Sequence, residues 1–184
     1  MKPKPARIVT ERLVLRPLED GDREALLSMA RDSRITATYM IPDFADAAQE
    51  DAFFRRMRAL SAAETRFVYG ISLGGELIGF LNDCGTDGDG IEIGYFISPG
   101  HWNRGYATEA LRAAIGALAA MGFRRVEAGC FEENPASGRV MEKCGMRPLG
   151  RASLLPYRGR EHRCLYRGIT VTSGAPEERS RAEQ

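Results

Sequence analysis

The sequence contains no apolar run that approaches the roughly 20 residues of a membrane-spanning helix. Its first residues, MKPKPARIVTERL, carry charge without the apolar segment of a signal peptide, so we expect a cytoplasmic protein with no membrane partner. An excess of charge of one sign is also missing, because 26 Lys and Arg residues balance 25 Asp and Glu residues. This balance argues against nucleic acid as a partner.

Cysteine and histidine are scarce. The four cysteines are widely spaced and form no Cys-x-x-Cys pair: Cys84, Cys130, Cys144 and Cys164. Their spacing indicates neither a disulfide framework nor a zinc site, so we expect free thiols and no bound metal. The two histidines, His101 and His162, are expected on loops without a catalytic role, although His162 in the last hairpin could contact a substrate.

The sequence has 43% hydrophobic and 28% charged residues, a composition typical of a soluble globular protein. A chain of 184 residues can bury a sizeable core, so we expect a single domain over residues 1–171. The chain ends in SGAPEERSRAEQ, and this polar composition favours a disordered tail over residues 172–184.

Apolar periodicity and turn residues predict the element order β, α, α, β, β, β, α, β, α, β, β. A first strand ends at Pro17, and Gly74-Gly75 joins the two strands of a hairpin. A turn-rich connection, DCGTDGDG, then leads into the strand GIEIGYFI. This order predicts one mixed sheet with helices on its faces.

The stretch SPGHWNRGYATEA, residues 98–110, places glycine and small residues between that strand and a helix with a three-four apolar repeat. The first amides of a helix have no intrahelical partner and suit an anion, especially a phosphate. The small side chains of Gly105 and Ala107 leave the backbone amides accessible to a phosphate, and Arg104 can add a cationic contact to it. Taken alone, a Gly-x-Ala sequence is more typical of an ordinary strand-to-helix turn.

Four segments resemble, in order and spacing, the GNAT acetyltransferase superfamily, and most closely its RimJ/RimL-like branch of ribosomal-protein N-terminal acetyltransferases: TERLVLRPL, ELIGF, EIGYFISPGHWNRGYATEAL and ENPASGRVMEKCGM. The resemblance extends from Ile8 to Val171. It implies the GNAT fold, an α/β (α+β) architecture with a single mixed, mostly antiparallel central sheet of about seven strands and about four helices. It also implies that the anion is the pyrophosphate of acetyl-CoA, the co-substrate, and that no metal is needed.

The phosphate loop of the superfamily is usually Gln/Arg-x-x-Gly-x-Gly/Ala, which this sequence matches at Gly105 and Ala107. The sequence differs from this pattern at Trp102, which stands where the superfamily usually has Gln or Arg. This difference is familiar in the RimJ/RimL-like branch. The backbone of Phe96 and Ile97 should pair with the pantetheine amides. The resemblance thus implies these cofactor-binding residues: Phe96, Ile97, Trp102, Asn103, Arg104, Gly105, Tyr106, Ala107, Thr108 and Asn134. Of these, we expect Tyr106 to pack rather than to donate a proton.

Acetylation of an amine needs a proton acceptor, because an amine with a pKa of about 10 is only about one part in a thousand neutral at pH 7. Glu92 resembles the strand glutamate that superfamily members often use through water. The sequence fits an alternative equally well. In it, Glu92 is an ordinary solvated carboxylate on the strand, and a water chain held by other groups accepts the proton of the amine. Some branch members use a carboxylate in the last hairpin, but LLPYRG offers none there.

Asn134 and Ser137 match the branch pattern Asn-x-x-Ser. The resemblance implies that the asparagine contacts the cofactor and that the serine hydroxyl protonates the leaving sulfur. Asn134 before Pro135 is also a good helix cap, and the two roles are compatible. An ordinary first-turn serine is the competing interpretation of Ser137.

The resemblance predicts an acetyl-CoA-dependent N-acetyltransferase that acts directly on a primary amine, with a homodimer left open. Acetylation of an antibiotic or polyamine, or a silent acyl-CoA-binding domain, are the alternatives. The acceptor would lie against residues of the first two helices and the last hairpin: Tyr39, Met40, Phe44, Phe53, Tyr157 and Arg158. Together with Arg160 and Arg163, these do not form the acidic lining expected for polycations, which favours a peptide N-terminus or an anionic amine. A solvated basic hairpin explains the arginines without any acceptor.

Overall fold

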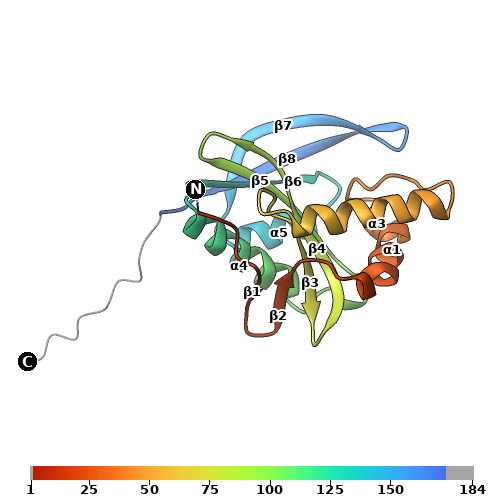
Figure 1. Cartoon of the computed structure of the whole chain (residues 1–184). Coiled ribbons are helices and arrows are strands. Elements are labelled where there is room, and N and C mark those ends of the chain that lie inside the picture. The colour runs from red at the N-terminus through yellow and green to blue at the C-terminus, as the bar shows by residue number, and fades with distance from the viewer. Residues whose placement is uncertain (1, 173–184) are drawn as a thin grey trace, which may run out of the picture.

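The computed structural model describes residues 2–172, so the predicted tail lies outside the described residues except for Thr172. One sheet of eight strands runs through the molecule in the order β1-β2-β3-β4-β5-β6-β8-β7 (Figure 1). The strands are β1 (Ile8–Val9), β2 (Leu13–Arg16), β3 (Tyr69–Leu73), β4 (Glu76–Asp87), β5 (Gly90–Ile97), β6 (Arg125–Phe131), β7 (Arg147–Tyr157) and β8 (Arg160–Thr170). The helices are α1 (Arg23–Arg31), α2 (Ser33–Thr36), α3 (Ala47–Ala62), α4 (Tyr106–Met121) and α5 (Pro135–Lys143), with 3-10 turns η1 (Asp20–Asp22) and η2 (Pro99–His101).

The predicted mixed, mostly antiparallel sheet is confirmed, since every neighbouring pair of strands is antiparallel except β5 and β6. The predicted counts of strands and helices are close, and the differences are local. Where one first strand was expected, β1 and β2 form a short antiparallel pair. Thr10 turns the chain there, because its hydroxyl accepts a hydrogen bond from the Leu13 amide at 2.9 Å.

The prediction of a turn-rich connection over DCGTDGDG is wrong. Strand β4 continues through Cys84 to Asp87, with a register shift against β5 between Asp83 and Gly85. The turn itself needs only Gly88, whose φ is 58°, and Asp89. A bulge absorbs the irregular residues, so this glycine-rich segment stays in the sheet.

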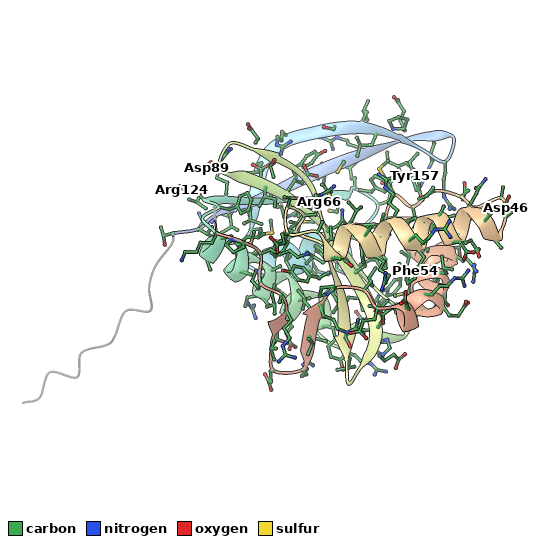
Figure 2. All side chains as sticks on the ribbon, viewed as in Figure 1. Asp46, Phe54, Arg66, Asp89, Arg124 and Tyr157 are labelled. Atoms are coloured by element: carbon green, nitrogen blue, oxygen red, sulfur yellow. The ribbon has the colours of Figure 1, made fainter. Side chains whose placement is uncertain are left out.

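Helices cover both faces of the sheet (Figure 1). On one face, α4 and α5 bury an apolar cluster that includes Ile93 and Leu111. On the other face, α1 and α3 bury a second cluster with Leu26, Phe54 and Phe80, and Phe54 lies on the side of α3 that faces α1 (Figure 2). Within residues 2–172, none of these helices has the length and apolar character needed to cross a bilayer.

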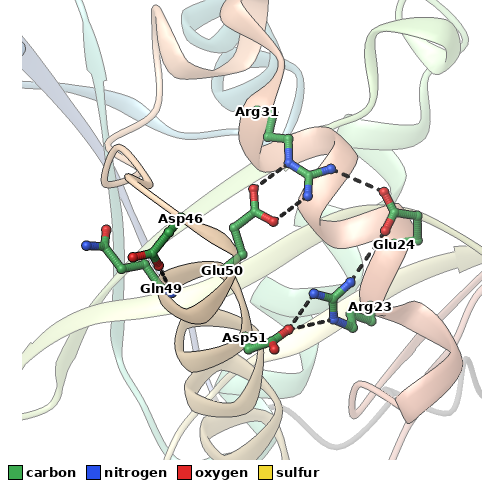
Figure 3. A network of polar contacts seen from close by, with 7 residues as sticks. All are labelled: Arg23, Glu24, Arg31, Asp46, Gln49, Glu50 and Asp51. Carbon is green, nitrogen blue, oxygen red and sulfur yellow. Dashed lines mark hydrogen bonds and ion pairs between the residues drawn. The ribbon is translucent and has the colours of Figure 1, made fainter.

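Ion pairs hold α3 against α1 (Figure 3). Arg31 donates from Nε to Oε1 of Glu50 at 2.7 Å and from Nη1 to Oε1 of Glu24 at 3.2 Å, while Arg23 pairs with Asp51. Each exposed pair contributes little to stability. The pairs of Arg23 with Asp51 and of Arg31 with Glu50 nevertheless connect the two helices on their exposed side.

Candidate active site

The central cavity opens where β5 and β6 part. These strands pair over three residue positions, the last being Glu92 opposite Glu127, and then diverge. Beyond that point lies a cavity of about 560 Å³. The predicted site residues that line it are Phe96, Ile97, Trp102, Asn103, Gly105, Tyr106, Ala107, Thr108, Asn134 and Ser137. The structure therefore brings together the predicted site residues except Arg104 and Glu92.

The loop before α4 bends sharply enough to aim backbone amides at this cavity. Asn103 has a φ of 60°, and Gly105, the N-cap of α4, has a φ of 83°. The amide of Glu109 makes the first helical hydrogen bond, to the carbonyl oxygen of Gly105 at 3.0 Å. The amides of residues 106–108 therefore precede the helical ladder and remain available to an anion.

Arg12 braces this loop from the far end of the sequence. Its Nη1 donates to the carbonyl oxygen of Arg104 at 3.0 Å, and its Nη2 lies 2.6 Å from Oε2 of Glu109. The guanidinium also stands 4.6 Å from the centre of the Tyr106 ring, which packs against the core. The Arg104 side chain is not part of the cavity lining. Sequence reasoning missed Arg12, because no local pattern links residues so far apart.

Asn134 and Ser137 meet at the start of α5. The side chain of Asn134 accepts a hydrogen bond from the Ser137 amide at 3.2 Å, which confirms the predicted cap. The Ser137 hydroxyl lies 3.0 Å from the Tyr95 hydroxyl. Burial raises the pKa of Tyr95 above its usual range, so this phenol keeps its proton at neutral pH. Tyr95 was not predicted; its place in the alternating strand, on the same side as Ile93 and Ile97, is the signal that could have found it.

Glu92 lies apart from this group. It belongs to the paired part of β5, before the strands diverge, and is not among the residues that line the cavity. Burial raises the pKa of its carboxyl; Arg151 opposes this effect and Glu127 adds to it. The structure thus places Glu92 beside a second carboxylate and away from Ser137.

The carboxylate that does line the cavity is Glu133. It lies next to His162, for which the expectation of a loop position is wrong. His162 belongs to β8, has 2% of its surface exposed and stacks on Phe131 with ring centres 4.3 Å apart. His101, by contrast, lies in the short 3-10 turn η2 between β5 and α4, close to the expected loop position, and lines the cavity.

A second cavity of about 270 Å³ lies under α3 and shares Tyr39 and Phe96 with the first. Of the residues expected near an acceptor, Tyr39, Met40 and Phe53 line it, whereas Phe44, Tyr157 and Arg158 do not. Its charged lining residues are Arg56 and Arg66, so it presents no carboxylate.

Tyr157 has a different place, at the end of the β7–β8 hairpin (Figure 2). Its hydroxyl donates to the carbonyl oxygen of Ile41 at 3.1 Å, and Arg158 pairs with Asp43. These contacts join the hairpin to the segment after α2. Tyr157 and Arg158 therefore tie the hairpin to that segment and line neither cavity.

No cluster of three metal-binding side chains occurs in the part of the chain that the structure describes. The groups that line the cavity determine which chemistry the site can support. They are a helix N-terminus with open amides, a serine and tyrosine pair, and a carboxylate. This set suits binding of a phosphate-bearing co-substrate and movement of protons.

Comparison with known proteins identifies the family. Residues 12–147 match the family described as an acetyltransferase (GNAT) domain. An uncharacterized N-acetyltransferase, YoaA of Bacillus subtilis (strain 168), is 30% identical over 146 residues, covering 77% of this chain and 82% of that protein. An acetyltransferase structure from Bacillus anthracis is 28% identical with a TM-score of 0.74, covering 89% of this chain and 98% of that one.

A more distant structure has the same fold. RimL, a ribosomal L7/L12 alpha-N-protein acetyltransferase in complex with coenzyme A, is 17% identical with a TM-score of 0.76, covering 94% of this chain and 100% of that one. Both the matched family and the similarity to YoaA extend over most of the sequence, including the loop before α4. The chain belongs to the GNAT family of acetyltransferases.

Proposed function

We propose that this chain is an acetyl-CoA-dependent N-acetyltransferase of the RimJ/RimL-like branch that transfers acetyl directly to a primary amine, such as a peptide N-terminus. The observation that carries the proposal is the cavity between the diverging strands β5 and β6, into which the N-terminus of α4 presents its first amides. The fold shared with RimL supports the choice of branch.

The residues present fit acetyl-CoA. The amides of residues 106–108, left bare by Gly105 and Ala107, would hold the pyrophosphate. The edge of β5 at Phe96 and Ile97, which faces the gap, would pair with the pantetheine amides. The co-substrate supplies the reactive thioester and the sulfur leaving group.

Two cations on α5 extend this site. Arg139 and Lys143 are spaced four residues apart on one face of the helix and line the cavity, and neither has an ion-pair partner among residues 2–172. We assign them to the remaining phosphate of the co-substrate. Replacing both by alanine should weaken binding of acetyl-CoA but leave binding of its 3′-dephospho form unchanged, as measured by calorimetry.

The chain's own groups can handle the protons of direct transfer. Ser137, held by Tyr95, would protonate the departing sulfur. Two carboxylates are candidates for the proton of the amine: Glu92, acting through water, and Glu133 in the cavity wall. Burial raises the pKa of Cys130, the thiol in the lining, and so disfavours its thiolate and a covalent acetyl-enzyme.

The apolar second cavity, with two arginines and no carboxylate, favours a peptide N-terminus or an anionic amine over a polyamine or aminoglycoside. The test is titration of the protein with acetyl-CoA in a calorimeter, followed by release of free thiol with N-terminal peptides, polyamines and aminoglycosides. Binding with peptide-dependent thiol release is expected. Binding without turnover on any amine would leave a silent acyl-CoA binder, and absence of binding would reject the proposal.

A further inference from the structure

We infer that Glu133 is the group that receives the proton of the acceptor amine, and that His162 positions it. This inference rests on the proposed function. Among the residues that line the central cavity, Glu133 is the single carboxylate within the described part of the chain. The other ionisable lining groups that carry charge at neutral pH are cations: Arg34, Arg139 and Lys143. An ammonium that enters the cavity therefore has one anionic partner there.

His162 stands directly behind this carboxylate. Its Nδ1 lies 3.4 Å from Oε1 of Glu133. Its Nε2 accepts a hydrogen bond from Nε of Arg160 at 3.0 Å, so in the neutral ring the proton sits on Nδ1, toward Glu133. That buried nitrogen has no hydrogen-bond partner among residues 2–172. A buried donor without an acceptor is unfavourable, and a small movement of Glu133 would supply one.

The imidazole cannot easily turn away. Its ring is stacked on Phe131 with an interplanar angle of 20°, and its side chain is 3% exposed. Arg160 from the same strand approaches Glu133 with Nη2 at 3.7 Å from Oε1. Glu133 is therefore faced by an N–H donor and a guanidinium, which can hold its carboxylate in one orientation toward the cavity. Hydrogen bonds of this kind are often long before substrate binds and shorten in the complex.

The proposed step balances as follows. The ammonium of the acceptor gives one proton to the carboxylate of Glu133, and the amine nitrogen regains its lone pair. That pair forms the new C–N bond with the acetyl carbonyl carbon, while the C–S bond breaks and its electrons go to sulfur. The sulfur takes a proton from Ser137, and the serine oxygen regains one from solvent. Glu133 then returns its proton to water, and the amide nitrogen loses its second proton to solvent.

The chain offers a matched control in the adjacent residue. Glu132 does not line the cavity and pairs with Arg163, with Nη1 2.6 Å from Oε1. Glu133→Gln and Glu132→Gln therefore remove the same charge one residue apart. Thiol release is measured for both variants with a primary alkylamine, which is protonated at neutral pH, and with hydroxylamine, which is already uncharged.

We expect Glu133→Gln to lower kcat/KM with the alkylamine by about 100-fold or more, the usual contribution of a general base, and to lower it far less with hydroxylamine. Acetyl-CoA affinity and the melting temperature should stay at wild-type values, as should every property of Glu132→Gln. Equal losses with both amines, or wild-type rates for Glu133→Gln, would overturn the inference. If Glu92→Gln alone shows the amine-dependent loss, Glu92 is the base. A wild-type protein that binds acetyl-CoA but releases no thiol would instead overturn the proposed function.

The positioning role of His162 has its own measurement. His162→Asn keeps an N–H donor near the place of Nδ1, whereas His162→Gln keeps a polar group near Nε2 and loses that donor. We expect kcat/KM with the alkylamine to fall in His162→Gln, because the carboxylate loses the donor that orients it, and to recover in His162→Asn, while KM for acetyl-CoA stays unchanged in both. A wild-type kcat/KM in His162→Gln, or an equal loss in both variants, would reject the positioning role.

Discussion

The indole Nε1 of Trp102 donates a hydrogen bond to the carbonyl oxygen of Ile97 at 2.6 Å. This bond ties the loop before α4 to the last residue of β5, the two segments that are proposed to hold the pyrophosphate and the pantetheine of the co-substrate. It gives a physical reason for a tryptophan at a position where the superfamily loop usually has glutamine or arginine: the residue needed is a long side chain with a donor at its tip.

Trp102→Phe keeps an aromatic ring but removes this donor. We expect acetyl-CoA to bind about fivefold more weakly, because loss of one hydrogen bond costs about 1 kcal/mol. The melting temperature should change little, since the side chain is 43% exposed. Calorimetric titration with acetyl-CoA measures the effect, and an unchanged Kd would show that the bond does not set the position of the loop.

Gly105 is required by backbone conformation. Its φ of 83° is strained for a β-branched residue, and a Cβ would also lie 3.4 Å from Nη2 of Arg12. Gly105→Val should therefore move the amides of residues 106–108 and weaken acetyl-CoA binding by about tenfold or more, a cost of about 1.4 kcal/mol. The protein should remain folded.

Gly100 provides the control for this substitution. A Cβ there meets nothing within 4 Å and the residue has no positive φ, so Gly100→Val should bind acetyl-CoA as the wild type does. Equal affinities for the two variants would reject the phosphate-loop assignment. Circular dichroism of both variants separates a moved loop from an unfolded chain.

Ser137 and Tyr95 are expected to act on turnover and not on binding. Ser137→Ala removes the proposed donor to the sulfur and should lower kcat by about 100-fold. Tyr95→Phe keeps the serine and removes only its 3.0 Å partner, so its loss in kcat should be smaller. Single-turnover thiol release at saturating acetyl-CoA measures both; a loss that appears only in KM would assign the pair to binding.

Local patterns in the sequence predicted the elements that build the phosphate loop and the start of α5. Gly105 lies at the N-cap of α4, Gly122 ends the same helix with a φ of 107°, and Asn134 caps α5, each as a result of its own chemistry and that of its neighbours. Sequence patterns of this kind predict helix ends well because the hydrogen bonds of a helix cap form between residues that are close in the sequence.

Contacts across the sheet were not predictable in this way. His162 reaches Glu133 only because β8 pairs with β6, with Cys164 opposite Phe131, and no spacing in the sequence encodes that register. The same holds for β4, where a bulge between Asp83 and Gly85 keeps a turn-like composition in the sheet. The position of Glu92 depends on a contact of the same kind: the point where β5 and β6 part decides which residues line the cavity, and Glu92 lies before that point.

The ionisation of Glu92 should change the melting temperature of the protein as the pH is varied. Burial raises the pKa of this carboxyl in the folded state above the ordinary 4.5, so the folded protein favours the protonated form. The stabilising contribution of Glu92 is then fully present below pH 4.5 and is lost as the pH rises through the folded-state pKa. Glu92→Gln removes the charge, so its melting temperature should exceed that of the wild type at pH 7, and the difference should shrink toward pH 4.

Glu76→Gln, at the exposed first residue of β4, controls for loss of one surface charge. Melting curves of the wild type and the two variants between pH 4 and pH 7 make the comparison. Destabilisation of Glu92→Gln at pH 7 would mean that attraction to Arg151 outweighs burial and the repulsion from Glu127, and that the carboxylate is held ionised in the folded protein. Stabilisation would instead show that burial and the repulsion from Glu127 outweigh the attraction to Arg151, so that the folded protein carries an unfavourable charge at Glu92 at neutral pH.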